Sequence, residues 1–428
     1  MEINDLYTLY KQYPTITTDS RKCTPGSIFF ALKGENFNGN QFATQALKDG
    51  CSYAIVDEAD YVTDDKRIIL VDNCLSTLQA LAHYHRKALG LPIIGITGTN
   101  GKTTTKELTA ACLAQKFNVL ATEGNLNNHI GVPLTLLKLT PSHEIAIIEM
   151  GASHPGDIKE LVEIAEPNYG IITNVGKAHL QGFGSFEGVL QTKCEMYDFI
   201  RAHKGHIFIQ HENLYLQPQS NGIEKTEYGI SENLFISGSI IDCSPFLFFE
   251  MKHNNISIKI QTQLIGSYNL TNALAAAAIA VYFGVKPNKI KDAIETYIPQ
   301  NKRSQLQKTK YNTLIIDAYN ANPTSMGAAL DNFVQIKANH KAVILGNMGE
   351  LGIESENEHR KIIGRLQETN FDKVLLSGNE FCKIDNNFEC FSSTNNLIEE
   401  LKKNPLKGYT ILIKGSRSTQ LERCIEWL

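Results

Sequence analysis

A glycine-rich turn followed by a lysine is the segment of this chain whose residue types point most directly to a chemistry. Residues 95–105 read Gly-Ile-Thr-Gly-Thr-Asn-Gly-Lys-Thr-Thr-Thr and follow an apolar run at 91–94. The pattern predicts a buried strand, a tight turn and a helix that opens at Lys102. Such a turn directs backbone N–H groups and a helix N-terminus at one point, which suits a phosphate. We expect Lys102 to reach the β- and γ-phosphates of a nucleoside triphosphate and the Thr103 hydroxyl to hold Mg²⁺.

The glycine spacing is a shorter variant of the eight-residue phosphate-loop template. The template requires a glycine five positions before Gly101, where this chain has Ile96, so Gly98 and Gly101 frame a Gly-x-x-Gly-Lys-Thr turn instead. A turn that binds nothing is disfavoured, because glycine, lysine and threonine all stand in the context that the motif requires. The expected nucleotide-binding residues of the loop are Gly98, Thr99, Asn100, Gly101, Lys102, Thr103 and Thr104.

Polar residues follow other predicted strands of the same region, and the carboxyl ends of parallel strands share one edge of a sheet. Glu149 closes a strand at 145–150, where a carboxylate beside a phosphate loop would hold Mg²⁺. His179 follows a strand at 170–174, and a metal or phosphate role there competes with a structural one. Asn127 and Asn128 follow a strand at 118–122 and form either a plain turn or a polar floor for a sugar or peptide.

Polar loops also follow strands near the C-terminus. Lys414 and Arg417 come after a strand at 411–413, a place where cations suit a carboxylate or a phosphate. Residues 317–323 (Asp-Ala-Tyr-Asn-Ala-Asn-Pro) close one strand and open a helix, and residues 346–352 (Gly-Asn-Met-Gly-Glu-Leu-Gly) close another. By periodicity alone these two segments are ordinary connections between strands and helices.

Alternating strands and helices position these residues and divide the chain into three expected domains. Residues 1–90 form a small α/β domain that ends at a Gly-Leu-Pro boundary. Residues 91–300 carry the phosphate loop on a parallel sheet covered by helices, with an antiparallel appendage at 222–265. Residues 301–428 resume the alternation and predict a small Rossmann-like domain. The expected fold class is therefore α/β, with a central phosphate-loop ATPase domain.

The composition is that of an ordinary globular protein. The 428 residues are 42% hydrophobic, and the net charge of −4 offers no basis for binding nucleic acid. The longest apolar stretch, residues 273–285, is too short to span a membrane. Nine cysteines are scattered singly, which predicts free thiols in a reducing compartment. We expect a cytoplasmic monomer that is not inserted into a membrane.

Several motifs along nearly the whole chain resemble those of the Mur ligases, the ATP-dependent enzymes that build the peptide stem of peptidoglycan. They are the phosphate loop 98–103, Glu149-Met-Gly-Ala, Asn174-Val-Gly-Lys-Ala-His179 and Tyr268-Asn-Leu-Thr-Asn272. Segments 127–135, 317–323 and 346–352 resemble the branch that joins D-alanyl-D-alanine to UDP-N-acetylmuramoyl-tripeptide. Segment 18–34 is similar to the UDP-binding domain that this branch shares with the MurE-like ligases. The resemblance implies that residues 1–90 bind the UDP-sugar and that residues 301–428 bind ATP and the dipeptide.

The resemblance also implies a mechanism and a role for each residue. ATP phosphorylates the terminal carboxylate of the tripeptide, and the amine of D-alanyl-D-alanine then displaces phosphate from the acyl phosphate. The implied catalytic residues are Lys102, Lys193 and His179, with Lys193 matching the carbamylated lysine of the family. The implied Mg²⁺ ligands are Thr103, Glu149, His179 and Lys193. The implied ATP contacts outside the loop are Asn269, Asn272, Arg303 and Asn320. The implied substrate contacts are Ser20, Arg21, Asn127, Asn128, Lys414 and Arg417.

Two positions depart from the family pattern. Asn347 stands where an aspartate is usual, and Asn40 where a histidine is often found.

The alternative functions are a MurE-like ligase, a folylpolyglutamate-synthase-like ligase, or a nucleotide-dependent binding module without catalysis. The segment 317–323 disfavours the MurE-like ligase, and the presence of Glu149 and Lys193 disfavours the binding module. The sequence leaves open whether the third residue of the tripeptide is diaminopimelate or lysine.

Overall fold

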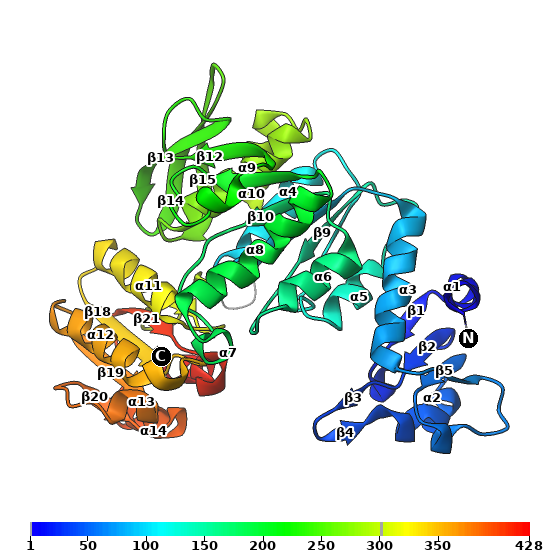
Figure 1. Ribbon diagram of the computed structural model, residues 1–428. Coiled ribbons are helices and arrows are strands. Elements are labelled where there is room, and N and C mark those ends of the chain that lie inside the picture. Colours follow the sequence, from blue (N-terminus) through cyan, green and yellow to red (C-terminus); the bar gives the residue numbers. More distant parts are fainter. Residues whose placement is uncertain (1, 300–302) are drawn as a thin grey trace.

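The computed structural model describes residues 2–299 and 303–428. Three lobes follow one another along the chain, and each is built on its own principal β-sheet (Figure 1). The blue first lobe and the yellow-to-red third lobe flank a cyan-to-green central lobe (Figure 1). This is the expected three-domain α/β arrangement, although the expected boundary between residues 300 and 301 lies outside the described residues. No helix in the described part of the chain combines the length and the apolar character needed to cross a membrane.

The first lobe contains four parallel strands in the order β1-β2-β5-β6 and a two-stranded ribbon, β3-β4. The strands are β1 (Thr15–Thr17), β2 (Ser27–Phe30), β3 (Lys33–Gly34), β4 (Phe37–Asn38), β5 (Tyr53–Val56) and β6 (Ile68–Leu70). The helices are α1 (Ile3–Gln12), α2 (Ala43–Lys48) and α3 (Cys74–Leu89). Strand β2 is buried along its whole length, which explains its near-continuous apolar sequence. Helix α3 packs against both α1 and the central lobe and so joins the first two lobes.

The central lobe is built on a nine-stranded sheet in the order β15-β14-β13-β12-β11-β10-β7-β9-β8. The strands are β7 (Ile93–Thr97), β8 (Val119–Ala121), β9 (Ile145–Glu149), β10 (Tyr169–Ile172), β11 (His206–Gln210), β12 (Glu224–Gly229), β13 (Ile236–Cys243), β14 (Phe246–His253) and β15 (Ile256–Ile265). The helices are α4 (Lys102–Leu113), α5 (Gly131–Leu136), α6 (Asp157–Ala165), α7 (Leu180–Phe183), α8 (Phe186–Ala202), α9 (Asn269–Tyr282) and α10 (Pro287–Thr296). Because β7 lies between β10 and β9, the phosphate loop that follows it has strand-end loops on both sides.

The antiparallel appendage that the sequence predicts at residues 222–265 is antiparallel only in part. Strand β12 pairs in parallel with β11, and β13, β14 and β15 extend the same sheet, with antiparallel pairing only beyond β13. Helix α9 makes this continuity possible, because its small buried alanines pack across β11, β12 and β13. Helix α9 lies so close to β13 that a Cβ atom at Gly238 would lie 2.7 Å from the Leu274 side chain.

The third lobe has a six-stranded sheet in the order β16-β17-β21-β18-β19-β20. The strands are β16 (Gln305–Lys308), β17 (Thr313–Asp317), β18 (Lys341–Gly346), β19 (Lys373–Ser377), β20 (Glu389–Phe391) and β21 (Thr410–Lys414). The helices are α11 (Pro323–Gln335), α12 (Ser355–Gln367), α13 (Asn379–Cys382) and α14 (Thr394–Lys403). All neighbouring strands are parallel except β16, which runs antiparallel to β17 at the edge.

The expectation that every cysteine is a free thiol is wrong for one pair. Cys382 at the end of α13 and Cys390 in β20 form a disulfide, with their Cα atoms 5.5 Å apart. The two residues are eight positions apart in the sequence and show no Cys-x-x-Cys spacing. Their pairing follows from the turn that folds α13 back onto β20, a tertiary feature that residue spacing does not reveal. The other seven cysteines are free.

Candidate active site

The phosphate loop connects β7 to α4, and two glycines shape it. Gly98 has φ +139° and Gly101 has φ +78°, backbone conformations that L side chains rarely adopt. A Cβ atom at Gly98 would lie 2.1 Å from Thr173 Oγ1, so a side chain is excluded there for a second reason. The Lys102 side chain folds back over the loop, and its Nζ donates to the carbonyls of Gly98 (2.6 Å) and Thr99 (3.2 Å). The loop therefore presents one cation and a helix N-terminus to the same space.

The loop after β10 anchors the phosphate loop from one side. The Asn174 side-chain carbonyl accepts from the Asn100 backbone N–H (3.0 Å), and the Thr173 hydroxyl donates to the Asn100 carbonyl (2.6 Å). The sequence analysis places Asn174 in a family motif but assigns no site role to Thr173 or Asn174. Their position directly after a predicted strand was the available signal, since such residues face the neighbouring strand-end loop.

Two of the expected ATP contacts support the loop from α9. The Asn272 Oδ1 accepts from the Thr105 hydroxyl (3.2 Å), and its Nδ2 donates to Asn269 Oδ1 (2.9 Å). A Cβ atom at Gly101 would lie 2.5 Å from Asn272 Oδ1, so this amide sits directly behind the turn. The first turn of α9 thus buttresses the glycine-rich turn.

Two expected Mg²⁺ ligands each have a buried oxygen without a hydrogen-bond partner among the described residues. These oxygens are Thr103 Oγ1 and Glu149 Oε2. The other Glu149 oxygen, Oε1, accepts from Asn127 Nδ2 at 2.8 Å. Unpaired buried oxygens are costly, and a hydroxyl with a carboxylate is a donor set that suits Mg²⁺. The residues present therefore fit the expected metal, although no group of three or more His, Cys, Asp or Glu side chains within residues 2–299 and 303–428 is arranged to hold one.

Lys193 of α8 is a buried amine beside the phosphate-loop lysine. Only 2% of its surface is exposed, and its Nζ lies 5.4 Å from the centre of the Phe183 ring. Burial, reinforced by the charge of Lys102, lowers the pKa of Lys193 to about 7 against the opposing pull of Asp157 and Glu195. Burial likewise lowers the pKa of Lys102 to about 8, opposed by Glu149 and assisted by Arg303. A large fraction of the Lys193 amine is therefore neutral near physiological pH.

His179 meets a carboxylate of the third lobe. Its Nδ1 lies 2.5 Å from Glu350 Oε2, and this hydrogen bond lowers the pKa of Glu350. Both residues have left-handed backbones, and the Glu350 carbonyl also accepts from the backbone N–H of Gln181. The prediction of a metal ligand at His179 did not anticipate this partner, because Glu350 lies 171 positions further along the chain.

The expected third-lobe residues have different environments. The guanidinium of Arg303 stacks on the Tyr319 ring at 3.8 Å from its centre. Lys414 is 1% exposed, and its Nζ donates to Asp317 Oδ2 (2.6 Å), so its charge is already paired inside the lobe. Asn320 and Arg417 are exposed at the ends of β17 and β21.

Asn322 is a site residue that sequence reasoning missed. Its Nδ2 donates to Asn100 Oδ1 at the tip of the phosphate loop (2.9 Å), while its Oδ1 caps α11 by accepting from the Ser325 backbone N–H (2.8 Å). One side chain thus begins a helix of the third lobe and contacts the nucleotide loop of the second. The Asn-Pro pair at the start of a helix signalled the cap but not the contact between lobes.

This double role predicts that an Asn322→Ser variant separates the two contacts. Serine still caps a helix but is too short to reach Asn100, so we expect a nearly unchanged melting temperature and a severalfold higher KM for ATP. Asn322→Ala loses both contacts and should also lose about 1 kcal/mol of stability. Thermal melts and ATP-dependence curves on the two variants are the measurement. An unchanged KM in the serine variant would show that the contact with Asn100 does not matter for nucleotide binding.

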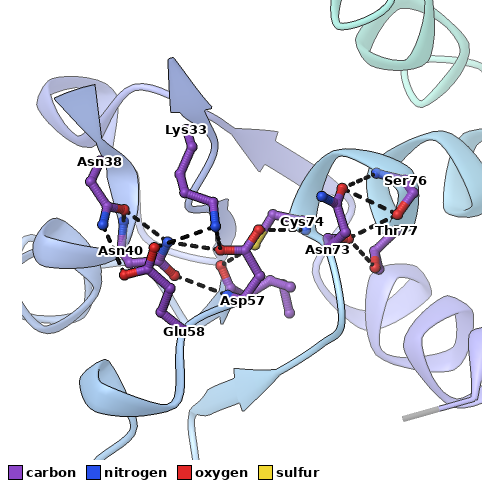
Figure 2. Close-up of polar contacts among 10 residues, drawn as sticks. Lys33, Asn38, Asn40, Asp57, Glu58, Asn73, Cys74, Ser76 and Thr77 are labelled. Atoms are coloured by element: carbon purple, nitrogen blue, oxygen red, sulfur yellow. Dashed lines mark hydrogen bonds and ion pairs between the residues drawn. The ribbon is translucent and has the colours of Figure 1, made fainter. Parts of the chain in front are cut away.

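The first lobe presents a polar network at the carboxyl edge of its sheet, and Asn40 lies in it (Figure 2). Asn40 is 1% exposed; its Nδ2 donates to Asp57 Oδ1 (2.9 Å) and its Oδ1 accepts from the Asp57 N–H (2.9 Å). Asp57 also accepts from the Cys74 N–H at the start of α3 and pairs with Lys33 (Figure 2). Asn40 stands at the position where the family pattern often has a histidine. Both polar atoms of its amide are already hydrogen-bonded to Asp57 within this network. The other departing residue, Asn347, has a buried Oδ1 without a hydrogen-bond partner among the described residues.

The two expected substrate residues of the first lobe lie in a short 3₁₀ helix, Ser20–Lys22. Asp19 caps this helix and pairs with the exposed Arg21 side chain (2.8 Å), which holds the pKa of Asp19 at about 2. Arg21 is therefore open to solvent, with its charge partly matched by its neighbour. Asn128 Oδ1 accepts from the Gly131 N–H (2.8 Å) in the turn that leads into α5, so Asn128 has a local structural role.

Comparison with known proteins places this site in a family. Family models match residues 12–86 (Mur ligase family, catalytic domain), 96–280 (Mur ligase middle domain) and 302–417 (Mur ligase, glutamate ligase domain). A UDP-N-acetylmuramoyl-tripeptide–D-alanyl-D-alanine ligase of Bacillus subtilis is 34% identical, over 96% of this chain and 92% of that protein.

Solved structures agree with the sequence comparison. A MurF crystal structure from Acinetobacter baumannii superposes with a TM-score of 0.88 at 29% identity, over 99% of this chain and 97% of that one. MurF from Thermotoga maritima in complex with ADP gives 0.86 at 26% identity, over 97% of each chain. A folylpolyglutamate synthase from Mycobacterium tuberculosis, at 13% identity and 0.63, shares the fold alone. The chain therefore belongs to the Mur ligase family and, within it, to the MurF ligases.

Proposed function

We propose that this protein is an ATP-dependent ligase that joins the amine of D-alanyl-D-alanine to the terminal carboxylate of UDP-N-acetylmuramoyl-tripeptide. The observation that carries the proposal is the meeting of Lys102, buried Lys193 and the unpaired oxygens of Thr103 and Glu149 around one phosphate loop. Relatives with that name resemble the chain along almost its whole length, and the T. maritima MurF structure contains ADP.

The chemistry explains why such a site is needed. A carboxylate is a poor electrophile, and an amine would only exchange a proton with it. Transfer of the γ-phosphoryl group of ATP to a carboxylate oxygen releases ADP and forms an acyl phosphate. The free amine then attacks the carbonyl carbon, the C–O bond to phosphate breaks, and the amine proton is lost to solvent. Products are the amide, ADP and phosphate.

The residues of the central lobe divide this work. Lys102 places its charge where the β- and γ-phosphate oxygens accumulate negative charge, and the loop N–H groups hold the phosphates. Thr103, Glu149 and carbamylated Lys193 would hold Mg²⁺, and His179 would hold or support a second ion. The metal would neutralise phosphate charge and hold the reacting oxygens in place. Gln181 and His179 bring the Glu350 loop of the third lobe to this same edge.

The other two lobes would bind the parts of the substrates that do not react. Residues 1–90 hold the uridine end through the edge that bears Ser20 and Arg21. Residues 301–428 hold ATP through Arg303 and Asn320, and the dipeptide near Arg417. Lys414 acts through Asp317, with which it is already paired. Asn127 faces the tripeptide side while it orients Glu149. The proposed location is the cytoplasm.

The proposal predicts that ATP turnover needs both acceptor and donor. Purified protein with ATP and Mg²⁺ should release phosphate only when UDP-N-acetylmuramoyl-tripeptide and D-alanyl-D-alanine are both present. Tripeptides ending in diaminopimelate and in lysine should differ in kcat/KM, which identifies the natural third residue. Glutamate and free diaminopimelate serve as negative controls for the related ligases. Turnover with glutamate or free diaminopimelate in place of the dipeptide would overturn the assignment.

A further inference from the structure

A second lysine of the phosphate-loop helix is buried without an obvious task. Lys106 lies one turn after Lys102 in α4 and is 3% exposed. The only hydrogen bond of its ammonium within residues 2–299 and 303–428 goes to the Thr122 carbonyl (2.6 Å). Its nearest carboxylate is Glu107, whose Oε1 lies 3.7 Å away and whose other oxygen accepts from the Tyr297 hydroxyl. Burying an ammonium with so few partners is expensive, so helix packing alone does not account for a lysine here.

Thr122 connects the Lys106 ammonium to Glu149, the carboxylate expected to bind Mg²⁺. It follows β8, and its own N–H donates to the Ile147 carbonyl of β9 (3.0 Å). Its hydroxyl oxygen accepts from the backbone N–H of Glu149 (2.9 Å). Lys106 therefore holds the carbonyl of the residue whose hydroxyl holds Glu149. The path runs from the phosphate-loop helix, across the edge strand, to the end of the strand that carries the carboxylate.

Glu149 depends on such support because its two oxygens are used differently. Oε1 accepts from Asn127, and Oε2 is buried without a hydrogen-bond partner among the described residues. An unpaired carboxylate oxygen can point usefully at a cation only if the backbone behind it does not shift. The Thr122 hydroxyl holds that backbone, and the Lys106 ammonium holds Thr122.

We propose that Lys106 is a positioning residue for the magnesium site, acting on Glu149 through Thr122. The inference rests on the proposed function only in expecting a nucleotide and Mg²⁺ in this site. It requires no particular muramoyl substrate. Its effect should appear in the step by which Mg²⁺ strengthens nucleotide binding. The affinity of the phosphate loop for nucleotide without metal should not depend on it.

The test measures ADP binding by calorimetry in EDTA and again in saturating Mg²⁺. For Lys106→Met, which keeps the length of the side chain but removes the charge, affinity in EDTA should stay within about twofold of wild type. The strengthening by Mg²⁺ should fall by about tenfold, the size of effect expected when a group supporting a metal ligand is lost. Circular dichroism and thermal melting establish that the variant is folded.

A matched pair at Thr122 tests the same path if Lys106→Met does not fold. Thr122→Ser keeps the hydroxyl and should bind MgADP as wild type does, whereas Thr122→Val removes it and should lose the Mg²⁺ gain. In the Lys106→Met, Thr122→Val double variant the losses should be less than additive, because both act through Glu149.

Two outcomes overturn the inference. One is a folded Lys106→Met or Thr122→Val protein with an undiminished gain from Mg²⁺. The other is an equal loss of affinity in EDTA and in Mg²⁺, which would make Lys106 part of the loop scaffold only. Failure of the proposed function looks different, because it would remove dependence on the dipeptide while leaving these binding differences intact.

Discussion

Lys102→Ala is expected to abolish ligation, with kcat falling by at least about a thousandfold, while the protein stays folded. The Gly98 and Thr99 carbonyls hold the Lys102 ammonium over the loop, which places its charge close to where the phosphates are expected to bind. Its pKa, lowered to about 8 by burial, leaves it mostly protonated at pH 7. Phosphate release with saturating substrates is the measurement.

Two controls bound this result. Lys48→Ala removes an exposed lysine at the end of α2 and should leave kcat unchanged. A thermal melt shows whether Lys102→Ala is folded, since loss of the two hydrogen bonds within the loop is local. Near-normal turnover in a folded Lys102→Ala protein would mean that this loop is not the triphosphate site.

Lys193→Arg is expected to be as inactive as Lys193→Ala, although arginine preserves the positive charge. A lysine ammonium cannot bind Mg²⁺, whereas a neutral lysine amine with CO₂ forms an anionic carbamate whose two oxygens are ligands that Mg²⁺ prefers. The pKa of Lys193, about 7, supplies the neutral amine that this addition requires. Arginine stays protonated and cannot form the carbamate. The measurement is kcat for both variants at equal protein concentration.

Several observations would distinguish the carbamate from a simple charge effect. Lys193→Glu should recover part of the activity if its shorter side chain reaches the metal. Wild-type activity should fall when dissolved CO₂ is removed and return with bicarbonate, whereas the Arg variant should respond to neither. An active Lys193→Arg protein, together with an unmodified Lys193 in a structure with Mg²⁺ and nucleotide bound, would show the role to be wrong.

The residues that the sequence could identify share one property: their neighbours in the chain supply the geometry. Gly98, Gly101 and Lys102 lie in one turn between a buried strand and a helix, so local backbone preferences determine their arrangement. Apolar runs predict the strands that end near Glu149 and His179. The alternation of such runs with helices predicts the three α/β domains. The branch within the family followed from motifs such as 317–323, each a short continuous segment.

Only the tertiary structure decided which of these segments meet. Asn322 contacts Asn100, and His179 contacts Glu350, across distances of more than 150 positions in the chain. Lys414 pairs with Asp317 on the neighbouring strand. The sequence predicts a cation at the edge of a cleft, whereas the structure shows a buried ion pair. Strand order, the packing of α9 and the docking of the third lobe set these pairs. They are properties of the whole core, and no local pattern of residue types encodes them.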